Sequence, residues 1–212
     1  MIAKAALVCS CLAALHGVSA LRLPLRASAT ASRPRFIRSW VGAAVAASTL
    51  PPVAGAASTQ TYTDQQYGIT FDAPSSWTRD EKEITGRRRL IVFADPDDPT
   101  TNAFIAYTPI RGDFISLGSF GTVDDVSHTV LPEGEGISSE LVRLEAKNRT
   151  YIFDYIVRQT GRPDKRIKTR WYVVPGNQLV TVTAQCDDSK HGGPTGTTLD
   201  GIISSFRYAA VP

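Results

Sequence analysis

The sequence predicts an α+β domain in which a mostly antiparallel sheet of about six strands packs against helices. Three observations support this prediction. Short runs of alternating apolar and polar residues recur along the chain, turn residues separate them, and only two segments carry helical signals. Neighbouring runs joined by tight turns form antiparallel pairs, so the sheet is expected to be built largely from hairpins.

The first three expected strands each stop at a turn signal. Residues 69–71 run into Pro74, residues 89–93 are closed by the Asp- and Pro-rich segment 95–99, and residues 102–108 follow. Proline cannot donate to a sheet ladder, and Asp-Pro clusters favour turns. These signals place three strands in the first half of the domain.

A first helix is predicted to begin near Thr122 and to end before Pro132. The hydroxyl of Thr122 can cap the free amides of the first turn, and Asp124 and Asp125 favour a helix N-terminus. A second helix follows a Gly-Gly-Pro break, because Leu199 and the apolar residues after it are spaced for one helical face.

Two hairpins lie between these helices. Residues 138–146 and 151–157 form the first, with Val142 among the apolar residues that alternate along it. Residues 167–174 and 178–186 form the second, and the intervening Pro-Gly-Asn suits a tight turn.

Three targeting segments are expected before the domain. Residues 1–20 resemble an ER-type signal peptide, and residues 21–39 have the Arg-, Ser- and Ala-rich, acid-free composition of a plastid transit peptide. Residues 40–56 carry an apolar core, two prolines and an A-x-A site, which are typical of a thylakoid lumen transfer signal whose basic start overlaps the transit peptide. This order predicts passage through the ER and the plastid envelope of a complex plastid, with residues 57–212 as the mature lumenal domain. The alternative is one secretory signal followed by an Ala-rich linker.

The charge of the whole chain conceals that of the domain. Six of the 23 basic residues and none of the 20 acidic ones lie in residues 1–56, so the remainder has 17 basic against 20 acidic residues. A mildly acidic domain offers little support for nucleic-acid binding. Cys186 is the single cysteine of residues 57–212, which excludes a disulfide within that domain. It shares a strand face with Val180 and Val182, so we expect a buried thiol rather than a reactive one.

Five motifs occur in order along residues 67–206. They are YGITFDAPSSW at 67–77, FADP at 93–96, NAFIAYTP at 102–109, ISLGSFGTV at 115–123 and SSF at 204–206. Together they resemble the PsbP family, the extrinsic lumenal proteins of photosystem II.

The resemblance implies an α/β/α sandwich with helices on both sides of the sheet. It also implies peripheral docking on lumenal subunits of photosystem II, in assembly or in stabilising the oxygen-evolving complex through calcium and chloride retention. The best-known members begin with a long, partly basic lead, whereas residues 57–66 contain no Lys or Arg. The chain therefore resembles a divergent PsbP-domain member more than the main subunit.

Two acidic turns are candidate calcium sites, because calcium prefers oxygen ligands. Their residues are Asp95, Asp97, Asp98, Asp187, Asp188 and His191. Ordinary turn chemistry is the alternative interpretation. Two basic segments are candidate docking surfaces for an acidic partner. Their residues are Arg87, Arg88, Arg89, Arg158, Arg162, Lys165, Arg166, Lys168 and Arg170. Solvated loops are the alternative for these.

Enzymatic activity is not expected. The domain has two histidines and one cysteine, in no recognisable catalytic setting, and it lacks the nucleophile-elbow, P-loop and dinucleotide motifs. The alternative function is a soluble lumenal enzyme or small-ligand carrier on the same fold, with a cleft floored by Trp171, Tyr172 and Tyr155.

Overall fold

The computed structural model describes residues 58–84 and 88–209, and the expected targeting segments lie outside these ranges. The described strands form a seven-stranded sheet of order β3-β4-β5-β9-β8-β7-β6 and a three-stranded sheet of order β1-β2-β10, with every pair antiparallel. The strands are β1 Thr59–Asp64, β2 Ile69–Pro74, β3 Thr78–Ile84, β4 Arg88–Ala94, β5 Asn102–Pro109, β6 Ile137–Lys147, β7 Thr150–Gln159, β8 Lys165–Val174, β9 Gln178–Asp187 and β10 Arg207–Tyr208.

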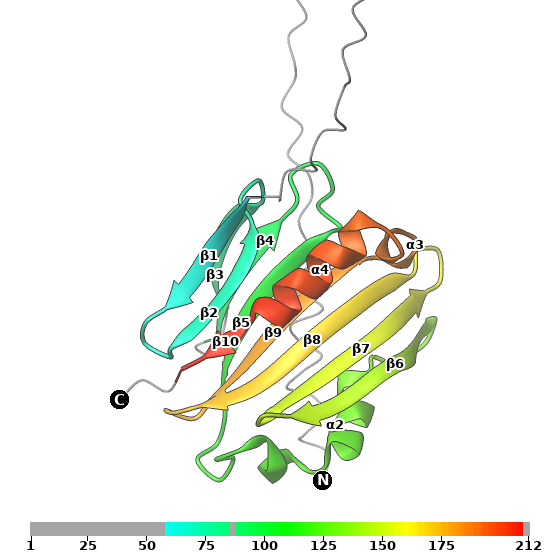
Figure 1. The fold of residues 1–212 in the computed structure, drawn as a ribbon. Coiled ribbons are helices and arrows are strands. Elements are labelled where there is room, and N and C mark those ends of the chain that lie inside the picture. Colours follow the sequence, from blue (N-terminus) through cyan, green and yellow to red (C-terminus); the bar gives the residue numbers. More distant parts are fainter. Residues whose placement is uncertain (1–57, 85–87, 210–212) are drawn as a thin grey trace, which may run out of the picture.

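Helices cover both faces of the seven-stranded sheet, which confirms the predicted α+β class. On one face, helix α4 (Pro194–Ser205) lies across β8 and β9 beside the three-stranded sheet, and the short α3 (Asp188–His191) precedes it (Figure 1). On the other face lie the 3₁₀ helix η3 (Leu117–Phe120) and helix α2 (Val123–Val130). No helix of the described ranges has the length and apolarity needed to cross a bilayer.

The alternation of side chains along the strands builds one core on each face. The α4 face buries Phe71, Phe93, Val182 and Leu199 among others, and the small sheet closes over it. The α2 face buries Val126 together with aromatic residues of β7 and β8. All described strands and helices lie within residues 59–208, and the domain bounds 57–212 stay a prediction.

The predicted helix start at Thr122 is confirmed. The Thr122 hydroxyl accepts a hydrogen bond from the Asp125 amide at 3.2 Å, and the Asp125 carboxylate accepts one from the Thr122 amide at 3.0 Å. This reciprocal capping box satisfies two of the free donors at the N-terminus. The helix ends at Val130, two residues before Pro132.

Both predicted hairpins are confirmed, with one local correction. Their turns use positive φ angles, at Asn148 (50°) and Arg149 (61°) in the first and at Gly176 (82°) and Asn177 (57°) in the second. In β6, however, the register shifts between Leu141 and Arg143, so Val142 is the extra residue of a β-bulge and is 46% exposed. The prediction that Val142 belongs to the apolar face is therefore wrong.

Cys186 is fully buried in the core beneath α4, as the strand pattern predicts. Burial raises the pKa of its thiol to about 11, with further contributions from the neighbouring carboxylates Asp187 and Asp188. A thiol in this state is neutral at ordinary pH and is a weak nucleophile.

Candidate functional site

Most of the predicted site residues lie at one end of the seven-stranded sheet, which we call the charged end. The turn between β4 and β5, the turn between β7 and β8, and helix α3 meet there, because Asn102 pairs with Gln185 and Lys165 pairs with Asp187. In Figure 1 this end is at the upper right, beside the start of α4. Acidic and basic residues that are far apart in the sequence are thus neighbours.

The two acidic turns are joined by a lysine. The Lys190 ammonium lies 2.7 Å from Asp98 Oδ2 and 3.5 Å from Asp187 Oδ2. Asp98 also accepts hydrogen bonds from the hydroxyls of Thr100 and Thr101. Burial by itself would raise the pKa of the Asp98 carboxyl, but the hydrogen bonds from Lys190 and the threonines outweigh it and hold the pKa well below its ordinary value.

Lys190 occupies the position between the two acidic turns that are predicted to bind calcium. Asp95 Oδ1 accepts a hydrogen bond from the Asp97 amide at 3.0 Å, which is ordinary turn chemistry. Across residues 58–84 and 88–209, no three His, Cys, Asp or Glu side chains are grouped so that they could hold a metal ion. A cation between Asp98 and Asp187 would have to displace Lys190, so calcium binding here stays a prediction.

Carboxylates pair with several residues of the basic segment between Arg158 and Arg170. Arg166 forms a two-pronged pair with Asp154, at 2.5 Å from Nε and 2.9 Å from Nη2, and both side chains are almost buried. Lys168 lies 3.6 Å from the same carboxylate and also pairs with Asp200. The charges of Arg166 and Lys168 are thus paired with carboxylates of the same fold. The docking role expected of these two residues stays a prediction.

Four other basic candidates, and Arg87, differ in their surroundings. Arg162 and Lys165 form no ion pair with any described residue, and Arg170 lies on the face beneath α4 with its guanidinium carbon 5.4 Å from the Phe206 ring centre. Arg87 lies outside the described residues, and Arg88 begins β4.

Arg89 joins the two sheets. Its Nη2 donates to Asp64 Oδ2 at 2.7 Å and to the Tyr62 hydroxyl at 2.8 Å, and its guanidinium carbon lies 4.7 Å from the Tyr107 ring centre. Asp64 and Tyr62 come from β1 of the small sheet, while Arg89 and Tyr107 come from the large sheet. This cluster holds the sheets together, which is a structural role, and the docking role expected of Arg89 stays a prediction.

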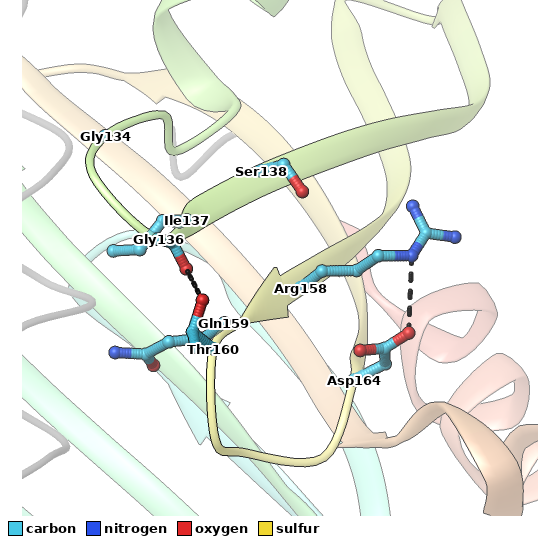
Figure 2. A pocket seen from close by; sticks show the side chains of 8 residues that line it. All are labelled: Gly134, Gly136, Ile137, Ser138, Arg158, Gln159, Thr160 and Asp164. Atoms are coloured by element: carbon cyan, nitrogen blue, oxygen red, sulfur yellow. Dashed lines mark hydrogen bonds and ion pairs between the residues drawn. The ribbon is translucent and has the colours of Figure 1, made fainter.

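A shallow depression of about 440 Å³ lies at the charged end, between the loop before β6 and the end of β7 (Figure 2). Its lining is polar and consists of Gly134, Gly136, Ile137, Ser138, Arg158, Gln159, Thr160 and Asp164. Arg158 is held between Glu140 at 2.6 Å and Asp164 at 3.3 Å. None of these lining residues is a cysteine, and none is a histidine that could activate Ser138. The lining residues therefore include no activated nucleophile of these kinds.

The predicted aromatic cleft is wrong. Trp171 and Tyr155 are each only 3% exposed and belong to the core on the α2 face. Tyr172 follows Trp171 in β8, and neighbouring residues of a strand point to opposite faces, so its ring packs on the α4 side against Phe206 and Tyr208. The three residues therefore line no common surface.

Comparison with known proteins agrees with this fold. A family model described as PsbP matches residues 57–208. The chain is 24% identical over 161 residues to the PsbP domain-containing protein 3, chloroplastic, of Arabidopsis thaliana, covering 69% of this chain and 63% of that protein. The chain thus spans less than two thirds of that relative's length.

One solved structure shows the same architecture. The solution structure of cyanobacterial PsbP (CyanoP) from Synechocystis sp. PCC 6803 matches with a TM-score of 0.58 and 20% identity, over 76% of this chain and 99% of that one. The Ran-binding protein Mog1p of Saccharomyces cerevisiae matches with a TM-score of 0.44 and 7% identity, over 73% of this chain and 97% of that one.

Proposed function

The chain belongs to the PsbP family, and on that premise we propose that it is a non-enzymatic extrinsic protein of the thylakoid lumen that associates with photosystem II. The observation that carries the proposal is the extent of the family match, which includes every described strand of both sheets. The chloroplastic relative supports a plastid location, and the three expected targeting segments support the lumen.

Two features support a role in assembly or stabilisation over ion retention through a free N-terminal lead. Residues 57–66 carry no Lys or Arg. In addition, Thr59–Asp64 is strand β1, which pairs along its whole length with β2 and contributes Asp64 to the cluster that joins the sheets. A segment used in this way is not available as a flexible basic arm.

Fractionation of isolated thylakoids tests the proposal. The protein is followed through low-salt and high-salt washes, with an integral photosystem II subunit as the control that salt does not release. We expect retention at low salt, release at high salt, and co-migration with photosystem II before release, because charge-based docking weakens as salt screens it. Recovery in the soluble lumenal fraction at low salt would contradict the proposal.

A further inference from the structure

Opposite the charged end, three arginines lie close to a pair of tyrosines. The ring centres of Tyr172 of β8 and Tyr208 of β10 are 4.4 Å apart with the rings tilted by 40°, and both are partly exposed. Arg170 lies two residues before Tyr172 on the same strand face, and Arg149 of the β6–β7 turn also lies near Tyr172. Arg207 precedes Tyr208 in β10 and lies near Arg170. We call these five residues the arginine–tyrosine patch. The β6–β7 turn and the ends of β8 and β10 lie toward the lower left of the fold in Figure 1.

The three arginines of the patch have no acidic partner. Within residues 58–84 and 88–209, no carboxylate lies within ion-pair distance of Arg149, Arg170 or Arg207. The Nε of Arg170 is buried without a hydrogen-bond partner among the described atoms. Burial lowers the pKa of Arg170 and the nearby positive charge of Arg207 lowers it further, while the Glu145 carboxylate raises it. A bound anion would offset the repulsion between the two arginines.

Contacts within the fold explain the positions of Arg170 and Arg207 but not that of Arg149. Arg170 contacts the Phe206 ring, and Arg207 Nη1 donates to the carbonyls of Ser204 and Phe206 at the end of α4, where a cation is favourable. Arg149 is exposed and forms no ion pair with a described residue, in a turn where its φ of 61° would suit Gly or Asn better. Local structure therefore gives no reason for a cation at Arg149.

We propose that the arginine–tyrosine patch is the docking surface for an acidic, Asp- or Glu-rich segment of a partner protein. The three unpaired guanidinium groups match carboxylates in charge and geometry. Tyr and Arg are enriched in the energetic centres of protein interfaces, whereas membrane-surface binding relies on larger Lys/Arg clusters with inserted apolar side chains. The exposed large apolar side chains of the described chain, Ile115, Leu141 and Val142, are not part of the patch. The identification of this partner as a photosystem II subunit rests on the function proposed above.

Two matched double variants of residues 57–212 test the proposal. R149N/R207Q removes two cations from the patch, and Asn suits the positive φ of the turn. R162Q/K165Q removes two unpaired cations from the charged end and gives the same net charge. Binding is measured to a synthetic Glu-rich peptide, to phosphatidylglycerol vesicles, and to photosystem II membranes stripped by a high-salt wash, with the melting temperature as the folding control.

We expect R149N/R207Q to weaken binding to the peptide and to the membranes by about tenfold or more, and R162Q/K165Q to weaken it by less than about twofold. Equal weakening by the two variants would overturn the patch assignment, because net charge alone would then explain binding. Binding to vesicles but not to the peptide would also overturn it, in favour of a lipid surface. If the wild type binds the peptide but not the membranes, the patch stands and the photosystem II proposal fails.

Discussion

The two ends of the seven-stranded sheet differ in how their basic residues are used. At the charged end, Arg158, Arg166, Lys168 and Lys190 each contact at least one carboxylate. At the arginine–tyrosine patch, Arg170 contacts an aromatic ring and Arg207 donates to backbone carbonyls instead. The difference shows that a basic run in the sequence does not by itself predict free positive charge, because carboxylates on other elements can pair with it.

The largest expected effect comes from breaking the most buried pair of the charged end. The side chains of Arg166 and Asp154 are only 13% and 11% exposed, so R166A leaves a carboxylate with Lys168 as its remaining close cation. We expect a loss of roughly 3 kcal/mol in the free energy of unfolding, measured by urea denaturation. Peptide binding should stay within about twofold of wild type if the charged end is structural.

The control for this variant is the apolar double variant R166M/D154L, which removes both charges. It should recover most of the lost stability, because replacing a buried pair costs far less than breaking it. Equal losses in the single and double variants would show that the packing of the stems, rather than the charge pair, stabilises this end.

A second change at the charged end tests its packing. A Cβ on Gly196 in α4 would stand 1.8 Å from the carbonyl oxygen of His191, which closes α3 against α4. We expect G196A to cost about 2 kcal/mol in the free energy of unfolding, because the backbone must shift. G201A is the matched control in the same helix, where an added Cβ meets open space and should be neutral or slightly stabilising.

The sequence predicts those structural features that depend on residues close together in the chain. The Thr122 cap, both hairpin turns and the α4 face were all readable, because each depends on residues close in sequence. Strand β3, with the sequence TRDEKEI, gave no apolar alternation, because it is an edge strand that pairs only with β4 and stays largely exposed. The bulge at Val142 likewise has no local signature.

The site was harder to predict, because ion pairing depends on strand register. Asp154 lies directly opposite Lys168 on the neighbouring strand, and Asp98 and Lys190 are 92 residues apart. A basic run read along the chain cannot show that carboxylates of other elements face it. The patch is hard to predict for the same reason, since Arg149, Arg170 and Arg207 come from three separate segments and only Arg170 is among the predicted docking residues.

A smaller effect is expected from the pH dependence of stability. Because the pKa of Asp98 is lowered by folding, its carboxylate contributes stability above the unfolded-state pKa near 4, and this contribution is lost as the pH falls through the folded-state pKa. D98N should therefore be less stable than wild type at pH 7, and the difference in melting temperature should shrink in acid. A difference that stays constant with pH would contradict the role assigned to the charged carboxylate.

The smallest effects on stability are expected for the two charge-removing double variants, R149N/R207Q and R162Q/K165Q. Neither pair takes part in an ion pair with a described residue, so each variant should unfold within about 0.5–1 kcal/mol of wild type. Urea denaturation measures this. A large loss in R149N/R207Q would mean that the contacts of Arg207 with the end of α4 carry more stability than the patch interpretation allows.

Hydrogen exchange of the protein, free and bound to stripped photosystem II membranes, tests the central claim most directly, because it locates the bound surface without mutation. We predict slower amide exchange on binding in the β6–β7 turn at residues 147–150 and in residues 206–209, with unchanged exchange in residues 134–138 and 160–164 of the charged end. Protection of the charged end with no change in the β6–β7 turn would contradict the claim that the unpaired arginines form the docking surface.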